Sequence, residues 1–156
     1  MTKLSLSEGI SLPELKSTTS VKSIQMGAIT SRDWAPLHSD QNWATEEGNL
    51  PDIIMNNYTI NGWISKYLTD LLGPSCRIGS IQFNIKKPIC PNQTMVFNGK
   101  VTSKEPIDDF RSWVFIEITI SVSNEIVTSS LVKAAIDESG KETNSPWTLD
   151  PEEWIP

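Results

Sequence analysis

Apolar and polar residues alternate along most of the second half of the chain, and this period of two constrains the fold more than any other feature of the sequence. From Val114 to Val122 every second residue is valine or isoleucine. Shorter runs of the same kind occupy 81–86 and 95–101, and a turn at Ser123-Asn124 leads into another at 126–136. Such alternation is typical of strands with one buried face, so we expect an antiparallel sheet.

One long helix is predicted ahead of these strands, at 53–72. Its apolar residues recur at helical spacing on one side, with Ile60, Ile64 and Leu68 among them. Gly62, inside this helix, costs about 1 kcal/mol relative to alanine, so we expect another backbone to pack closely against it. A single long helix followed by antiparallel strands indicates an α+β fold.

The length of 156 residues suits one globular domain. We expect an extended leader over 1–20 that settles into a strand near 21–29. The domain itself is predicted to cover 21–136, followed by a polar tail over 137–156. The leader is inferred from its glycine, proline and many serine and threonine residues.

The predicted tail is acidic, yet it carries Trp147 and Trp154. Tryptophan is rare in segments that remain disordered, because its large apolar ring is stabilised by burial. We therefore expect the tail to dock, either onto its own domain or onto a neighbouring molecule, where it would act as an extra clasp in a dimer.

Composition argues against several classes of partner and cofactor. The net charge of -6 and the pI of about 4.8 disfavour nucleic acid, because phosphates are bound by basic surfaces. No apolar run approaches the roughly 20 residues of a membrane span, and residues 1–12 lack a secretory signal, so we expect a cytoplasmic protein. Cys76 and Cys90 fit no disulfide or metal pattern, and we expect both to be reduced. With one histidine in the chain, no metal is expected.

The segment 31–40 holds that single histidine, His38, five residues after Asp33. Pro36 lies between them and favours a sharp bend, which can turn both side chains toward one point. A histidine titrates near neutral pH, and a carboxylate can orient it or take a proton beside it. Asp33 and His38 are therefore the candidate acid-base pair. The alternative is a loop histidine with an unrelated surface aspartate. Asp40 is expected to cap a short helix over 42–47.

Two stretches resemble motifs of the MaoC-like family, which includes the (R)-specific enoyl-CoA hydratases. Asp33-Trp-Ala-Pro-Leu-His38-Ser-Asp40 is similar to the family pattern Asp-Phe-Asn-Pro-x-His-x-Asp. Phe83-Asn-Ile-Lys-Lys-Pro88-Ile-Cys-Pro91-Asn-Gln looks like the family's Phe-x-x-Pro-Val-x-x-Gly-Asp strand and turn. The resemblance covers roughly 20–136 and implies a hot-dog fold, in which an antiparallel sheet wraps around one central helix.

The resemblance also implies the chemistry of the site. Asp33 and His38 would handle the water and the α-carbon proton when water is added to, or removed from, a 2-enoyl thioester of coenzyme A. Coenzyme A is then part of the substrate, and no separate cofactor is expected. The segment 61–74 looks more like the heteromeric branch of the family, which acts on bulky substrates such as steroid-side-chain thioesters.

A donor for the thioester oxygen is implied at the start of the central helix. In the family this donor is a backbone N–H, and the position aligns best with Asn57, or with Asn56 under a different gap. Ser65 falls where relatives carry a serine that lines the site. The alternatives are an ordinary polar first turn and a solvent-facing helix serine.

A basic group near the proposed site is the candidate contact for the coenzyme A phosphates. It consists of Lys86, Lys87 and Arg77. The alternative is a solvated strand edge whose lysines block aggregation. The sequence departs from the family pattern at two places: Ala35 replaces an asparagine, and Asn92-Gln93 replaces Gly-Asp. The missing asparagine bears on the placement of Asp33.

Two other functions remain open at this point. A hot-dog acyl-CoA thioesterase usually has a carboxylate on the central helix, but Asp70 lies close to the end of the predicted helix. A noncatalytic hot-dog subunit would complete the acyl-CoA pocket of a partner hydratase, although such a subunit would be free to lose Asp33 and His38. A single hot-dog unit leaves one sheet edge uncovered, so we expect a homodimer or a heteromer with a related subunit.

Overall fold

The computed structural model describes residues 6–74 and 76–156, and within them five strands form one antiparallel sheet. The strands are β1 (Leu15–Thr18), β2 (Arg77–Ile85), β3 (Thr94–Pro106), β4 (Arg111–Val122) and β5 (Glu125–Asp137). Their order across the sheet is β1-β3-β4-β5-β2, so β1 and β2 are the edges. The helices are α1 (Val21–Thr30), α2 (Gln41–Glu46) and α3 (Asn57–Leu72), and short 3₁₀ turns are η1 (Pro36–His38), η2 (Glu142–Asn144) and η3 (Pro146–Thr148).

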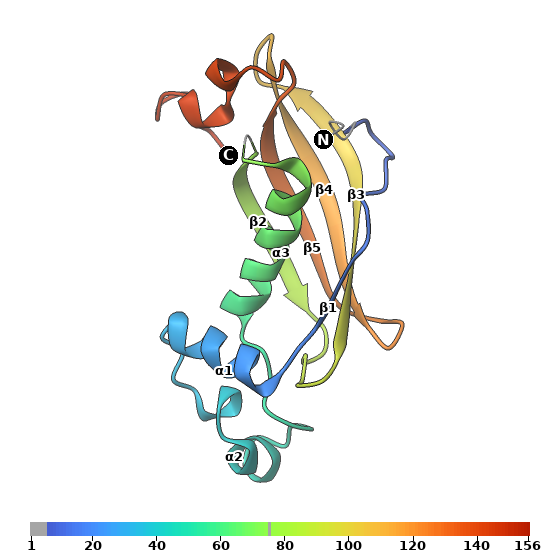
Figure 1. Ribbon diagram of the computed structural model, residues 1–156, viewed down its shortest axis with the longest axis vertical. Helices are drawn as coiled ribbons and strands as arrows, with labels where there is room; N and C mark the ends of the chain where they lie inside the picture. The colour runs from blue at the N-terminus through green and yellow to red at the C-terminus, as the bar shows by residue number, and fades with distance from the viewer. Residues whose placement is uncertain (1–5, 75) are drawn as a thin grey trace.

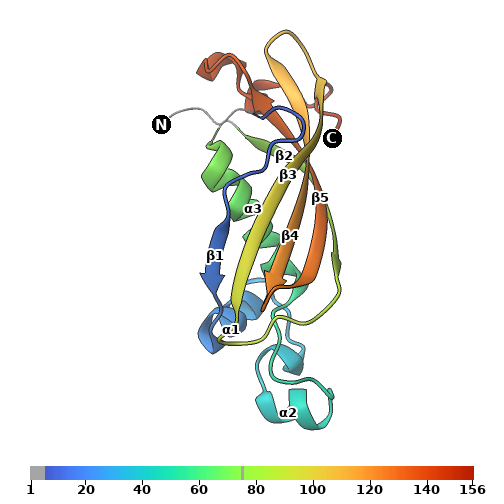
Figure 2. The ribbon, with the colours of Figure 1, turned by 90° about the vertical axis from the view of Figure 1, so that its right-hand side faces the viewer.

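Helix α3 lies along one face of the sheet, which curves beside it (Figures 1 and 2). Its residues Ile60, Ile64 and Leu68 are at most 1% exposed, as predicted. Burial of each such side chain contributes roughly 1.5–3 kcal/mol. The Tyr67 ring lies 5.8 Å from that of Phe97 on β3, centroid to centroid, and so joins the helix to the sheet. The predicted α+β architecture is confirmed.

The β4–β5 hairpin follows directly from the alternating pattern. Every second residue of β4 from Val114 to Ile120 is at most 1% exposed. Ser123 and Asn124 connect the strands with φ of 52° and 65°. A two-residue turn with both residues at positive φ matches the twist of the flanking strands, which explains the tight connection.

The strand predicted near 21–29 is wrong, because these residues form α1. Ser20 and Ser23 cap the helix reciprocally: the Ser20 hydroxyl accepts from the Ser23 N–H at 3.0 Å, and the Ser23 hydroxyl accepts from the Ser20 N–H at 2.8 Å. Ile24 and Ala28, one turn apart, face the interior. The strand at this end of the chain is β1, which lies inside the segment predicted as a leader. It pairs with β3.

Helix α3 begins at Asn57, four residues later than predicted. The Ile54 N–H donates to the Leu37 carbonyl at 3.0 Å, and the Met55 N–H donates to the Ile89 carbonyl at 2.8 Å. These bonds to distant parts of the chain hold 53–55 in an extended conformation. Asn56 then caps the helix with its side chain, which accepts from the Thr59 N–H at 3.0 Å.

Close packing against Gly62 was also expected, and this is wrong. A Cβ added to Gly62 would have no atom within 4 Å apart from its chain neighbours and the backbone of its own helix. The glycine in tight contact is Gly27 of α1, where an added Cβ would lie 2.1 Å from Oγ1 of Thr59. Helices α1 and α3 therefore cross at Gly27 and Thr59.

The C-terminal tail docks onto its own domain, which is the first of the two possibilities. The Arg77 guanidinium lies 3.6 Å from the centroid of the Trp154 ring and 5.1 Å from that of Trp147. The Trp154 ring also lies 4.9 Å from that of Trp113 on β4. Cation–π and aromatic contacts thus hold the tail at the start of β2.

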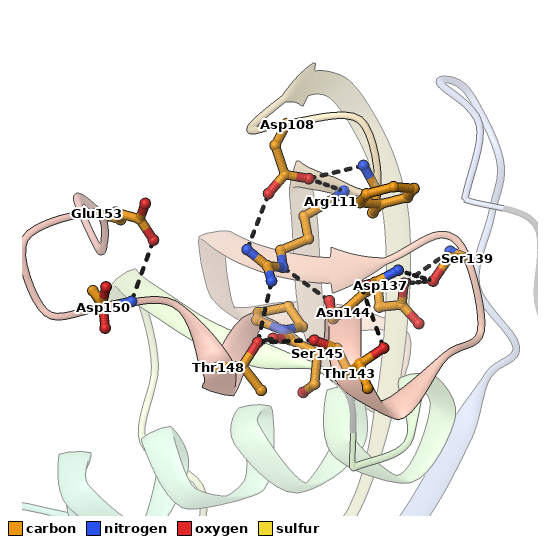
Figure 3. A network of polar contacts seen from close by, with 12 residues as sticks. Asp108, Arg111, Asp137, Ser139, Thr143, Asn144, Ser145, Thr148, Asp150 and Glu153 are labelled. Atoms are coloured by element: carbon orange, nitrogen blue, oxygen red, sulfur yellow. Dashed lines mark hydrogen bonds and ion pairs between the residues drawn. The ribbon is translucent and has the colours of Figure 1, made fainter.

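Polar contacts around Arg111 hold the first part of the tail (Figure 3). The Arg111 guanidinium donates to the Asn144 carbonyl at 2.9 Å and to the Thr148 hydroxyl at 3.1 Å. It also pairs with Asp108 at 3.0 Å, within the β3–β4 connection. The tail lies at one end of the molecule, whereas α1, α2 and the first turn of α3 gather at the other (Figure 1). Across residues 6–74 and 76–156, every helix is too short or too polar to cross a lipid bilayer.

Candidate active site

Asp33 and His38 meet beside the first turn of α3. Nε2 of His38 lies 3.2 Å from Oδ2 of Asp33. The His38 side chain is 8% exposed and that of Asp33 is 22% exposed. The carboxylate is thus reachable from solvent, while the imidazole is shielded. The contact excludes the interpretation of a loop histidine with an unrelated surface aspartate.

The end of α1 fixes the position of Asp33. Arg32 adopts the left-handed conformation with φ of 56°, which ends the helix and turns the chain back on itself. The Asp33 N–H then donates to the Ala28 carbonyl at 2.9 Å. Oδ1 of Asp33 accepts from the Ala35 N–H at 3.4 Å, a long bond that closes a local turn.

The extended segment before α3 fixes His38. Nδ1 of His38 lies 2.7 Å from the Ile54 carbonyl oxygen, which can only accept, so Nδ1 carries a hydrogen. The Ile54 N–H returns a bond to the Leu37 carbonyl at 3.0 Å. Nε2 is left facing Oδ2 of Asp33 at 3.2 Å, close enough for a proton to pass between the two groups. Just beyond, Asp40 caps α2 as predicted, accepting from the Trp43 N–H at 3.0 Å.

Asn56 connects this pair to α1 and α3. Its side-chain amide donates to the Ser31 hydroxyl at 2.8 Å and to Oδ2 of Asp33 at 3.1 Å. Its Oδ1 accepts from the Thr59 N–H at 3.0 Å and from the Thr59 hydroxyl at 2.5 Å. Asn56 is 2% exposed. The sequence allowed the backbone N–H of Asn56 as an alternative to that of Asn57 for the donor to substrate; the side-chain amide of Asn56 is directed at these two protein oxygens.

The surroundings of Asp33 favour its ionised form. The hydrogen bond from the Asn56 amide is the largest cause that lowers the pKa of Asp33 below its ordinary value. Partial burial opposes this by raising the pKa, while the Ala35 N–H and His38 lower it further. The net direction is downward, so Asp33 is a carboxylate at neutral pH and can accept a proton.

The Asn57 N–H is an open donor at the N-terminus of α3. Within the described residues it has no hydrogen-bond acceptor, whereas the Tyr58 N–H donates to the Asn57 side chain at 2.9 Å. The partial positive charge at the start of a 16-residue helix adds to the attraction for an anionic oxygen. Because Asn56 directly precedes it and touches Asp33, this donor and the acid-base pair lie at one site.

Three other residues predicted to line the site or bind coenzyme A are Ser65, Lys86 and Lys87. Ser65 is two turns beyond Asn57 in α3, and its hydroxyl donates to the Asn61 carbonyl at 3.0 Å. Lys87 pairs with Glu125 at 2.5 Å at the surface. Lys86 is exposed, with its backbone N–H bonded to the Val127 carbonyl at 2.8 Å.

The position of Arg77 argues against the predicted contact with coenzyme A phosphates. Arg77 follows the far end of α3, which has 16 residues and spans about 24 Å at 1.5 Å per residue. Its guanidinium is held between Trp147 and Trp154 and donates to the Pro146 carbonyl at 3.2 Å. Arg77 therefore belongs to the docking of the tail.

A groove of about 360 Å³ lies between α1 and α3, next to this network. Its lining includes Gly27, Ser31, Tyr58, Gly62, Trp63 and Lys66. Ser31 is shared with the hydrogen bonds of Asn56, so the groove begins beside the candidate site. The absence of a side chain at Gly62 keeps its outer part open.

The described residues offer neither a metal-binding cluster nor a reactive cysteine. In the ranges 6–74 and 76–156, no cluster of three or more His, Cys, Asp or Glu side chains is arranged to hold a metal ion. Cys76 and Cys90 are free and buried. Burial raises the pKa of Cys76 to about 12 and raises that of Cys90 as well, which disfavours the thiolate in both.

Comparison with known proteins gives a consistent result. A family model described as a MaoC-like domain matches residues 11–123. The beta subunit of 3-oxo-4,17-pregnadiene-20-carboxyl-CoA hydratase from Mycobacterium tuberculosis is 36% identical over 95 residues, which are 61% of this chain and 73% of that protein.

Solved structures agree on the fold. A chain of the ChsH1–ChsH2 complex from Mycobacterium tuberculosis matches with a TM-score of 0.74 and 28% identity, over 83% of this chain and 97% of that chain. The (R)-hydratase from A. caviae involved in PHA biosynthesis matches with a TM-score of 0.71 and 17% identity, over 86% and 98% of the two chains. These likenesses confirm the predicted hot-dog fold.

Proposed function

Since the chain belongs to the MaoC-like dehydratase family, we propose that it adds water to, or removes it from, a 2-enoyl thioester of coenzyme A. One observation carries this proposal: the contact of 3.2 Å between Asp33 and His38, next to the open N–H of Asn57. Hydration of a conjugated thioester requires a base for water, an acid for the α carbon and a donor for the carbonyl oxygen. The three groups at this site supply these functions.

In the proposed reaction, the Asp33 carboxylate takes a proton from a water molecule, and the hydroxyl adds to the β carbon of the substrate. The electron pair of the double bond moves toward the carbonyl, which becomes enolate-like. In hydration, Nε2 of His38 orients the water and donates a proton to the α carbon, and the proton taken up by Asp33 then passes to His38 across their contact of 3.2 Å. Dehydration uses the same groups in reverse. The hydrogen bond from Nδ1 to the Ile54 carbonyl keeps the ring in the orientation that this exchange needs.

The Asn57 N–H is the proposed donor to the thioester oxygen. Negative charge on that oxygen grows in the transition state, so a fixed backbone donor that holds the carbonyl of the bound substrate stabilises the transition state still more and lowers the barrier. Removal of one such donor typically costs about 2.7–4 kcal/mol. The donor is a backbone group, so the asparagine side chain itself is not essential to this role.

A bulky acyl group is the proposed substrate class. The curated relative at 36% identity is named as a subunit of a hydratase of a pregnadiene-carboxyl-CoA, a polycyclic thioester. The groove beside Ser31 is lined in part by Tyr58 and Trp63 and is kept open by Gly62, which suits a wide apolar group. Ser65 remains a proposed lining residue, and Lys86 and Lys87 remain the proposed contacts of the coenzyme A phosphates. No cofactor is proposed beyond the coenzyme A of the substrate.

Assembly with a second hot-dog subunit, identical or related, is part of the proposal. Strand β2 is an edge of the sheet, and its Ile78, Ile81 and Phe83 are only half-buried against the core. Ile85 is 39% exposed and Leu131 of the neighbouring β5 is 42% exposed. A partner at this edge would cover the partly exposed side chains of β2. A fully active, monodisperse monomer at micromolar concentration would contradict this part of the proposal.

Turnover assays on a series of thioesters test the function. The protein, alone and with any copurified partner, is offered crotonyl-CoA and then longer, branched and polycyclic enoyl-CoA esters. We expect hydration, faster with the bulky esters than with crotonyl-CoA. Binding of an enoyl-CoA without turnover under any of these conditions would favour the noncatalytic-subunit alternative. Thioester hydrolysis is not expected, because Asp70, near the end of α3, is exposed and paired with Lys66.

A further inference from the structure

Asn56 joins Asp33 to both α1 and α3 through its side chain. All four hydrogen-bonding positions of its amide are used: two donated bonds reach Ser31 and Asp33, and two accepted bonds come from Thr59. A buried amide with every position used is held in one orientation, because any rotation leaves a buried polar atom without a partner.

The Asp33 carboxylate depends on this amide. Oδ2, the oxygen that faces His38, accepts from Asn56 at 3.1 Å. Among residues 6–74 and 76–156, its other oxygen, Oδ1, accepts a single long bond of 3.4 Å from the Ala35 N–H, and the side chain of Ala35 has no donor. Of the titratable groups in the described residues, His38 alone contacts Asp33, and neighbouring Arg32 forms no ion pair with it.

We propose that Asn56 is a positioning residue of the acid-base pair: capped onto α3 through Thr59, its amide holds Oδ2 of Asp33 toward His38 and stabilises the carboxylate. The predicted effect of Asn56 on turnover rests on the function proposed above, whereas its predicted effect on the titration of Asp33 does not. The cap and the donor are separate parts of one side chain. Oδ1 caps the helix, and Nδ2 serves Asp33.

Substitutions can separate these two parts. In Asn56→Ser the hydroxyl remains as good an N-cap as asparagine, but the amide donor is lost. In Asn56→Asp the shape and the cap are kept, while a carboxylate oxygen replaces the donor about 3.1 Å from Asp33. Asn98→Ser makes the same change at an exposed position of β3 and serves as the matched control.

The direct measurement is the titration of the Asp33 carboxyl carbon by NMR, with its signal assigned by its loss in Asp33→Asn. We expect Asp33 to titrate at higher pH in Asn56→Ser than in the wild type, and higher still in Asn56→Asp, where two carboxylates repel. The control variant should match the wild type. Thermal unfolding of each variant shows whether the helix cap has survived.

Turnover gives the second readout. In Asn56→Ser we expect kcat to fall about tenfold with little change in KM, because a misplaced base affects the chemical step more than binding. The acidic limb of the kcat/KM profile should move to higher pH with the Asp33 titration. If the Asp33 titration is unchanged in both variants, Asn56 is a helix cap alone and the proposal is wrong, whatever happens to activity. If the wild type hydrates no thioester, the proposed function fails while the titration still decides the role of Asn56.

Discussion

A Cβ added to Gly27 would lie 2.1 Å from Oγ1 of Thr59, so α1 crosses α3 at a separation that only glycine permits. The same Thr59 hydroxyl donates to Oδ1 of Asn56 at 2.5 Å, and the Asn56 amide donates to Asp33. The packing of two helices is thereby coupled to the orientation of the candidate base. Changes at this crossing should affect both the stability of the fold and the site.

Gly27→Ala is expected to destabilise the protein. Alanine is favoured over glycine in a helix by about 1 kcal/mol, but overpacking of a tight contact costs typically 1–3 kcal/mol. The clash should dominate here, because Thr59 cannot rotate without leaving Asn56. We expect a net loss of up to about 2 kcal/mol in the free energy of unfolding, measured in denaturant.

Gly62→Ala provides the opposite case on the partner helix. Its added Cβ would have no atom within 4 Å, so only the helix propensity acts and stability should rise by up to about 1 kcal/mol. Equal effects of the two substitutions, or a more stable Gly27→Ala, would show that the crossing at Thr59 is not tight.

The β4–β5 hairpin, helix α3 and the Asp33–His38 pair could be predicted because each is determined by residues close together in the sequence. The alternation in β4 and the Ser123-Asn124 turn specify a hairpin by themselves, since each inward residue has a buried neighbour on the next strand. The apolar stripe of α3 likewise required a buried helix. Asp33 and His38 were found together because the bend at Pro36 and the motif place them within a few residues of each other.

Features that depend on distant contacts were missed. Residues 53–55 carry apolar side chains that suit a helix, yet bonds to Leu37 and Ile89 hold them extended. Because the helix start was misplaced, Asn56 was not seen as its cap and its link to Asp33 was not predicted. The reciprocal cap of Ser20 and Ser23 is a local signal that could have identified α1.

The stability of the wild type should depend on pH through Asp33. Its pKa is lower in the folded protein than in the unfolded chain, where it is about 3.9. The unfolded state therefore binds this proton first. Asp33 contributes stability above the unfolded pKa and loses it as the pH falls through the folded pKa. We expect Asp33→Asn to unfold with a weaker pH dependence in this acidic range, measured by denaturant titrations at a series of pH values. An unchanged slope would contradict the hydrogen bonding described for Asp33.

The docked tail should contribute measurably to stability. Trp154→Ala removes the contacts with Trp113 and with Arg77, and we expect a loss of about 1–3 kcal/mol from these aromatic and cation–π interactions. Ile155→Ala, next in the chain and 73% exposed, should change stability by less than about 0.5 kcal/mol. Truncation after Ile136 should cost more than Trp154→Ala. Equal unfolding midpoints for the truncated and full chains would contradict tail docking, and a change in oligomeric state on truncation would identify the tail as a clasp between subunits.

The acid-base role of Asp33 and His38 is the central claim, and single and double substitutions test it most directly. On a thioester that the wild type hydrates, His38→Ala and Asp33→Asn should each lower kcat by at least roughly 10²-fold, and the double variant should be little worse than the more severe single variant, because the two groups act on one water. Enoyl-CoA binding, measured separately, should persist in all three, since the Asn57 N–H that holds the thioester oxygen is unchanged. Near wild-type rates of hydration in both single variants would contradict the assignment of the active site to this pair.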